Sequence, residues 1–195
     1  MTLDGPVQDV APLFLGAVIS SAGVAVRLTE VEAYAGESDP GSHAARGPRP
    51  RNAPMYGPPG RLYVYFTYGM HWCVNVVTGP AGQASAVLLR AGEVVDGVVT
   101  AQTRRPRSTI RDLARGPARL ARALAIDGSY GGTDLFSPAS PVRLVPAPGD
   151  GPGHVLSGPR VGVAGAGAAT PWRFWLADEP TVSTYRAAVR RRPSA

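Results

Sequence analysis

The sequence predicts a single α+β domain whose short strands form a mostly antiparallel β-sheet. A chain of 195 residues is long enough for one hydrophobic core and too short for two typical domains, so residues 1–195 are treated as one unit. The apolar fraction of 44% with 17% charged residues is typical of a folded chain, while 24 Gly and 20 Pro indicate many turns and few long helices. The strongest local pattern is a pair of aromatic and β-branched runs three residues apart, which is typical of a β-hairpin.

The N-terminal part of the chain combines a helical and a strand pattern. Residues 6–20 carry apolar side chains at roughly helical spacing, interrupted by Pro12, and predict a short helix that runs into a strand. From Val24 the period changes to two, so one strand face would start apolar and become acidic and then aromatic through Val24, Val26, Leu28, Glu30, Glu32 and Tyr34. Residues 35–60 show no periodicity, and a loop of that length is usually functional or disordered; its arginines and His43 favour function.

The hairpin is predicted from the runs at residues 62–67 and 71–78, and residues 84–91 predict a third strand. Asn75 and Arg90 interrupt these apolar runs. A buried amide or guanidinium costs free energy unless it is hydrogen-bonded, so both side chains should have partners.

The second half of the chain predicts less regular structure. Pro117 is in the favoured first turn of a short helix, and Gly128 is its expected stop. Residues 127–160 are rich in Pro and Gly and predict short strands with long turns, and the stretch RVGVAGAGAATPWRFWL ends in an aromatic strand. The basic tail, residues 186–195, is expected to fray.

Composition excludes several kinds of chemistry. The net charge is +6, and all 20 basic residues are arginine, which suits a polyanionic partner, although many soluble proteins are basic. Without lysine, a Schiff base could form only at the N-terminal amine. The single cysteine, Cys73, excludes an intramolecular disulfide and a clustered-thiolate metal site. There is no secretory signal and no run of roughly 18 apolar residues, so we expect a cytoplasmic protein that is not secreted and has no membrane partner.

Glu30 and Glu32 form the first candidate catalytic group. One interpretation is a solvated strand end, where two carboxylates need no partner. The other is a general base, which needs a carboxylate partly shielded from water and oriented by a neighbour. Arg90 on an adjacent strand would supply that neighbour and satisfy its own burial.

Aromatic side chains form the second candidate group. They could be ordinary sheet aromatics, or Tyr34 and His43 could stack on the two faces of a flat ligand, with a hairpin tyrosine closing the edge. Tyr68 at the hairpin tip has little core to fill and suits a wedge. His43 with Glu37 and Asp39 matches no familiar ligand spacing, so no metal is predicted.

A third group is basic. The arginines of the 35–60 loop, among them Arg46 and Arg51, and the helix start at Gly116 suggest a surface for a phosphate backbone. Individually each is non-specific, because a charge run is more often a solvated surface.

In order along the chain, the sequence resembles the alkyladenine (3-methyladenine, N-methylpurine) DNA glycosylase family of the non-helix-hairpin-helix type. The resemblance covers about residues 8 to 187 and rests on TEVEAY, SHAARG, RNAPMYGPPGRLYVYFTYGMHWCVNVV, VLLRAGE, ARGPARLARALAI, RVGV and PWRFWL. It implies a base-excision repair enzyme that flips a damaged purine out of duplex DNA and hydrolyses its N-glycosidic bond. The implied fold is a curved, mostly antiparallel sheet with peripheral helices and one protruding hairpin that enters the minor groove.

The resemblance also implies roles for individual residues. Glu32 would activate water with the help of Arg90, and Glu30 would be structural. Asn75 would exclude the guanine amino group, and the stacking residues would be Tyr34, His43 and Tyr65. The DNA-contacting residues would be Tyr68 as the inserted wedge, Met70, Arg46, Arg51 and Gly116.

The expected partner is double-stranded DNA containing damaged purines, bound by a monomer without a cofactor or metal, at the bacterial nucleoid. The missing lysine agrees with a monofunctional glycosylase that leaves the abasic site uncut. Pro50 and Tyr56 depart from the family pattern, so loop shape and lesion range stay open. Two rivals are a non-catalytic nucleic-acid-binding protein and a glycosidase for free nucleosides or sugars.

Overall fold

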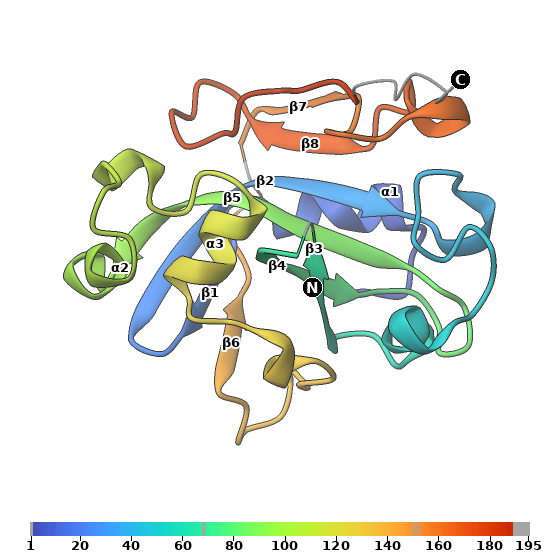
Figure 1. Ribbon diagram of the computed structural model, residues 1–195, viewed down its shortest axis with the longest axis horizontal. Helices are drawn as coiled ribbons and strands as arrows, with labels where there is room; N and C mark the ends of the chain where they lie inside the picture. Colours follow the sequence, from blue (N-terminus) through green and yellow to red (C-terminus); the bar gives the residue numbers. More distant parts are fainter. Residues whose placement is uncertain (1, 68, 150, 152, 189–195) are drawn as a thin grey trace.

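The computed structural model describes residues 2–67, 69–149, 151 and 153–188, which form one domain around an open, curved β-sheet (Figure 1). All pairings between its strands are antiparallel, in the order β3-β4-β5-β2-β1-β6. The strand β1 pairs with residues 24–27 of β2, and β8 pairs with residues 30–32 of the same strand. The strand β7 pairs with β8. The strands are β1 (Val18–Ser21), β2 (Val24–Tyr34), β3 (Leu62–Thr67), β4 (His71–Val77), β5 (Ala86–Asp96), β6 (Val142–Val145), β7 (Val155–Gly158) and β8 (Arg173–Leu176). The predicted fold class is confirmed.

The helices are short and lie around the sheet (Figure 1). They are α1 (Val7–Val10), α2 (Val98–Arg104) and α3 (Pro117–Ala123), with 3₁₀ turns at Ala11–Phe14, Gly36–Ser38, Pro50–Tyr56, Ile110–Asp112, Gly128–Tyr130 and Gly165–Gly167. The helix and strand predicted within residues 6–20 are confirmed as α1 and β1. Among the described residues, no helix has the length and apolar character needed to cross a membrane.

The main hydrophobic core uses one face of the central strands. Alternate side chains of β3, β4 and β5 belong to it, together with Phe14 after α1 and Leu120 of α3; the strand members include Leu62, Val74, Val76, Val87 and Leu89. The side chains between them, such as Tyr63 and Asn75, are not part of this core. The opposite face of the same strands is therefore available for a site.

The face predicted for the acidic residues of β2 is wrong. The pairing of β2 with β5 shifts register on both sides of Glu30, as at a β-bulge. Val24, Val26 and Leu28 lie in the main core, but the next core residues are Val31 and Ala33. Because the bulge moves the alternation by one residue, Glu30, Glu32 and Tyr34 lie on the opposite face from the row that starts at Val24.

Two boundaries and one helix also differ from the predictions. The third strand continues well past Ala91, to Asp96. The helix α3 ends at Ala123 rather than near Gly128, because Ala125 adopts a left-handed conformation with φ 53°. The helix α2 was not predicted, since its sequence VVTAQTR is rich in β-branched residues that favour strands.

Candidate active site

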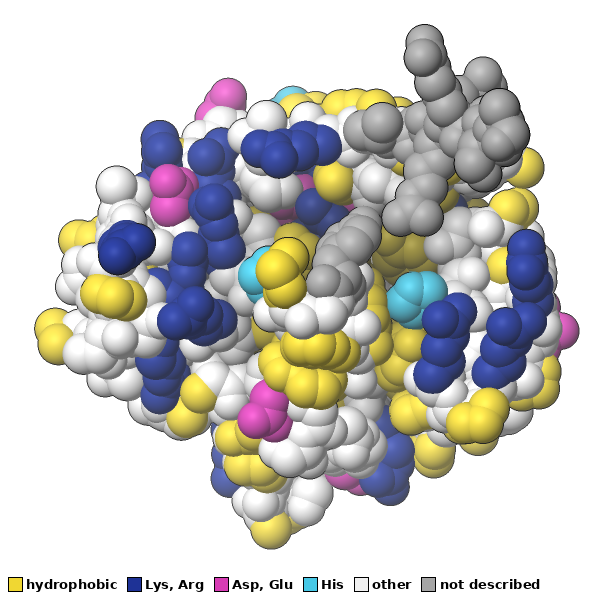
Figure 2. All heavy atoms as spheres, viewed as in Figure 1, with side chains coloured by type: hydrophobic (Ala, Val, Ile, Leu, Met, Phe, Trp, Pro, Cys, Tyr) yellow, Lys and Arg dark blue, Asp and Glu magenta, His cyan; other side chains and the backbone are white. Residues whose placement is uncertain are grey.

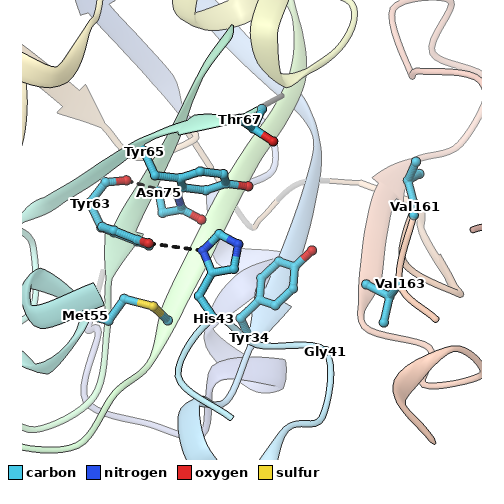
Figure 3. Close-up of a pocket in the computed structure, with 11 residues that line it drawn as sticks. Tyr34, Gly41, His43, Met55, Tyr63, Tyr65, Thr67, Asn75, Val161 and Val163 are labelled. Carbon is cyan, nitrogen blue, oxygen red and sulfur yellow. Dashed lines mark hydrogen bonds between the residues drawn. The ribbon is translucent and has the colours of Figure 1, made fainter. Parts of the chain in front are cut away.

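A cavity of about 190 Å³ opens on the sheet face opposite to the main core (Figure 3). The loop at residues 35–60 folds over the strands to form one wall, and the segment after Arg160 forms another. The lining residues are Tyr34, Gly41, His43, Met55, Tyr63, Tyr65, Thr67, Asn75, Val161, Gly162 and Val163. The structure thus brings together all four residues predicted to contact a base.

The aromatic side chains of the cavity are uncharged at neutral pH. His43 meets Tyr65 edge to face, with ring centroids 4.5 Å apart, and its Nδ1 lies 3.1 Å from the Tyr63 hydroxyl oxygen (Figure 3). Burial and the charge of Arg51 lower the pKa of His43 below its usual value, and burial raises the pKa of Tyr63 to about 12. The cavity can therefore offer neutral aromatic surfaces to a planar ligand.

The loop that carries His43 is anchored by the buried side chain of Asn52. Its Nδ2 donates to the carbonyl oxygens of His43 at 3.0 Å and Gly47 at 3.1 Å, and its Oδ1 accepts from the Arg49 amide. One side chain with no exposed area thus fixes three points of a long irregular loop. Buried polar groups satisfied in this way hold a loop in one conformation.

Arg160 anchors the other end of this loop. It is fully buried and donates to both carboxylate oxygens of Asp39, including one at 2.7 Å, and to the Ala33 carbonyl. Its guanidinium carbon lies 4.7 Å from the centroid of the Tyr34 ring. Arg160 therefore joins the loop to the strand that carries Tyr34.

Neither residue considered with His43 as a metal ligand points to a metal site. Asp39 pairs with Arg160, and Glu37 accepts a hydrogen bond from the Tyr56 hydroxyl at 3.0 Å. In the part of the chain that the structure describes, no three His, Cys, Asp or Glu side chains gather closely enough to hold a metal ion.

Glu32 lies fully buried beside the cavity, with donors on both carboxylate oxygens. Oε1 accepts from the Val161 amide at 2.7 Å, and Oε2 accepts from the Tyr34 hydroxyl at 2.8 Å and from Arg90 Nη1 at 3.3 Å. Burial and the neighbouring carboxylate raise the pKa of Tyr34 well above its usual value, so the hydroxyl remains a donor. These contacts orient a carboxylate whose remaining lone pairs can accept a bond from water.

Glu30, two residues before Glu32 on β2, is also fully buried. It pairs with Arg90 at 3.0 Å and with Arg173 at 2.6 Å. Burial alone would raise the pKa of Glu30, but the charges of Arg90 and Arg173 outweigh it and lower the pKa below 4.5. Arg90 thus contacts both glutamates, as expected for a buried guanidinium.

The lowered pKa of Glu30 makes part of the stability depend on pH. The unfolded chain protonates this carboxyl near pH 4.5, whereas the folded chain does so at lower pH, so the charged form stabilises the fold fully above pH 4.5. Glu30→Gln is expected to lower the free energy of unfolding by about 3 kcal/mol at pH 7. In urea unfolding, the difference from the wild type should shrink as pH falls below 4.5; a difference that stays constant down to pH 3 contradicts this assignment.

Four of the residues predicted to contact DNA, Met70, Arg46, Arg51 and Gly116, do not line the cavity. Met70 is 68% exposed beside the hairpin turn, and Arg46 and Arg51 are exposed in the loop. Gly116 precedes α3 at the edge of a second cavity that Arg90 also lines. Tyr68, the predicted wedge, lies outside the described residues. On the face of the molecule that Figure 2 shows, basic side chains lie on both sides of the centre.

Sequence reasoning missed several residues of the site. Arg160 and Asn52 were not singled out, and Tyr63 was considered only as one of several hairpin tyrosines. Val161 acts through its backbone amide, for which its side chain gives no signal. An isolated arginine in a stretch otherwise rich in Gly and Val was the available signal for Arg160.

The chain is similar in sequence to known proteins over most of its length. The family model described as "Methylpurine-DNA glycosylase (MPG)" matches residues 1–180. Relatives named "Putative 3-methyladenine DNA glycosylase" include one from Streptomyces avermitilis, 53% identical over 96% of this chain and 91% of its own length. Others are from Frankia casuarinae, 54% identical over 97% and 93%, and from Leifsonia xyli, 56% identical over 91% and 87%. The chain therefore belongs to the methylpurine-DNA glycosylase family and is a DNA glycosylase.

Proposed function

We propose that this DNA glycosylase excises alkylated purines, such as 3-methyladenine and 7-methylguanine, by hydrolysis with a water molecule that Glu32 activates. The observation that carries the proposal is a fully buried carboxylate, with both oxygens hydrogen-bonded, beside an aromatic cavity. A base in the cavity would place its sugar near Glu32. The buried, oriented carboxylate is what a general base requires.

The reaction follows the logic of an inverting glycoside hydrolase. Water loses its proton to Glu32 as its oxygen attacks the anomeric carbon, and the bond from that carbon to the purine nitrogen breaks. An alkylated purine with a positive charge takes the bonding electrons and leaves as a neutral base, so no general acid is needed. Arg90, the Val161 amide and the Tyr34 hydroxyl keep the carboxylate in position during this step.

The cavity suits an extruded purine. Tyr34, His43 and Tyr65 would hold the flat base, and their π faces attract a cationic one. Asn75 lines the same cavity and donates from Nδ2 to the Tyr63 carbonyl at 3.0 Å, which fixes its amide (Figure 3). We propose that this fixed amide excludes the amino group of an undamaged guanine.

The hairpin and the surrounding basic surface would hold the duplex. Tyr68 would fill the space of the flipped nucleotide, with Met70 beside it, and Arg46, Arg51 and Gly116 would contact the backbone. Base flipping costs a few kcal/mol, which the wedge and the stacking cavity offset. We propose that the protein binds damaged duplex as a monomer in the cytoplasm, at the nucleoid.

Single-turnover incubation with duplexes that each carry one lesion tests the proposal. Release of free 3-methyladenine or 7-methylguanine is expected, with duplex affinity that falls steeply as salt rises, because phosphate contacts release counterions. Binding without base release would favour the non-catalytic alternative. Release from free nucleosides with little dependence on salt would favour a glycosidase for small substrates. A panel that adds hypoxanthine and ethenoadenine then defines whether neutral lesions are also excised.

A further inference from the structure

Glu30 is surrounded by hydrogen-bond donors from three separate parts of the chain. Its Oε1 accepts from Arg90 Nε at 3.0 Å, from Arg173 Nε at 2.6 Å and from the Ser183 hydroxyl at 3.0 Å. Its Oε2 accepts from the Ser183 amide at 2.8 Å. A carboxylate with no exposed area and four donors is held in one orientation, yet it does not line the base cavity.

The same contacts fix the direction in which Arg90 points. Nε donates to Glu30, Nη2 lies 3.4 Å from the Ser183 hydroxyl oxygen, and Nη1 is left to face Glu32 at 3.3 Å. Because a guanidinium is planar and rigid, holding two of its nitrogens sets the position of the third. The contact between Arg90 and Glu32 thus depends on a carboxylate and a hydroxyl that lie outside the cavity.

Ser183 reaches this position because the C-terminal segment, residues 179–184, runs along β2. Glu179 pairs with Arg27 at 2.7 Å, and the hydroxyl oxygens of Thr181 and Thr29 lie 2.9 Å apart. Arg115 then donates to the carbonyl of Val182 at 2.8 Å. The segment is therefore held in place by contacts just before Ser183, so that it belongs to the site and is not a loose tail.

We propose that Glu30, together with Ser183 of the C-terminal segment, is the positioning residue that aims Arg90 at Glu32. This inference rests on the proposed function, in which Glu32 activates the attacking water. Glu30 then affects the rate of base release without contact with the base, the sugar or the water. The bulge in β2 makes this possible, because it moves Glu30 and Glu32 to the same side of the sheet as Arg90.

A double-mutant cycle tests whether Glu30 acts through Arg90. Wild type, Glu30→Gln, Arg90→Gln and the double variant are compared in single-turnover release of 7-methylguanine from a duplex. Glu30→Gln should slow release about tenfold in the wild-type background and less than about twofold in the Arg90→Gln background, because residues that act as a unit are not additive. Equal slowing in both backgrounds overturns the proposal.

Two further measurements separate positioning from a merely structural role. The reaction amplitude gives the active fraction, so the rate constant refers to folded enzyme only, and duplex affinity is measured in parallel. Positioning predicts a lower rate constant with affinity within about twofold of the wild type. A lower amplitude with an unchanged rate constant means that Glu30 only stabilises the fold, and it overturns the proposal.

Ser183→Ala and Glu93→Gln complete the design. Ser183→Ala keeps both glutamates, so it decides the question if Glu30→Gln does not fold. Base release slowed by roughly threefold in Ser183→Ala supports the proposal, and an unchanged rate overturns it. Glu93→Gln removes a partly exposed carboxylate on β5 that pairs with Arg27 and lies outside the C-terminal segment, and its rate constant should equal that of the wild type. A wild type that releases no base would instead refute the proposed function, so the two failures are distinguishable.

Discussion

Glu32→Gln is expected to reduce single-turnover release of an alkylated purine by about 10²-fold to 10⁴-fold, the usual contribution of a positioned general base. Glutamine has nearly the same size and can still accept from the Val161 amide or the Tyr34 hydroxyl, so the cavity should keep its shape. What it lacks is a carboxylate that can take the proton of water. The affinity of the variant for a lesion duplex should therefore remain close to that of the wild type, and a direct binding measurement checks this.

The matched control for this prediction is Glu93→Gln. Glu93 pairs with Arg27 at 2.7 Å through a partly exposed side chain on β5, away from the cavity lining. Its substitution removes the same charge and should leave the rate of base release unchanged. If Glu32→Gln also releases base at the wild-type rate, another group activates the water and the proposed mechanism is wrong.

Asp39→Ala is expected to destabilise the fold by about 3–5 kcal/mol, because it leaves a buried guanidinium without its counter-charge. Arg160 has no exposed area, and its Nε already has no hydrogen-bond partner within the described residues. Asp39 also accepts from the Gly41 amide at 2.9 Å, so the loop that carries His43 loses an anchor. The melting temperature should fall by roughly 6–20 °C for a chain of this size.

Thermal unfolding measures this effect, and single-turnover release reports the accompanying loss of the cavity wall. Glu37→Ala is the control, since the Tyr56 hydroxyl is the only side-chain hydrogen-bond partner of this exposed loop residue within the part of the chain that the structure describes. Its melting temperature should stay within about 2 °C of the wild type. An equally small change for Asp39→Ala would show that Arg160 does not depend on its carboxylate partner.

Much of the sheet could be predicted because its signals are local. The hairpin of β3 and β4 followed from two runs of aromatic and β-branched residues around a turn, and α1 and β1 from apolar side chains at roughly helical spacing interrupted by Pro12. Such patterns express backbone preferences of neighbouring residues. The helix α2 was missed for the same reason, since its β-branched sequence contradicts the structure that packing imposes.

The site could be predicted only in part. Glu32 and Arg90 stood out as polar residues within apolar strands, and the structure pairs them. The direction in which Glu30 and Glu32 point was wrong, because a bulge depends on pairing with a second strand and leaves no mark in the period of the first. Arg160 was missed because its partners lie more than 120 positions away.

The sequence by itself therefore determined the fold class, the hairpin and the choice of Glu32 and Arg90 as candidate site residues, because periodicity and residue type act locally. Only the tertiary structure decided which face carries Glu32, which backbone amide and tyrosine hold it, and how residues 179–184 reach the site. These features arise from contacts between segments far apart in the chain, where burial and hydrogen bonding select one arrangement. The catalytic carboxylate that we propose can thus be predicted from the sequence, whereas its orientation is a property of the folded molecule.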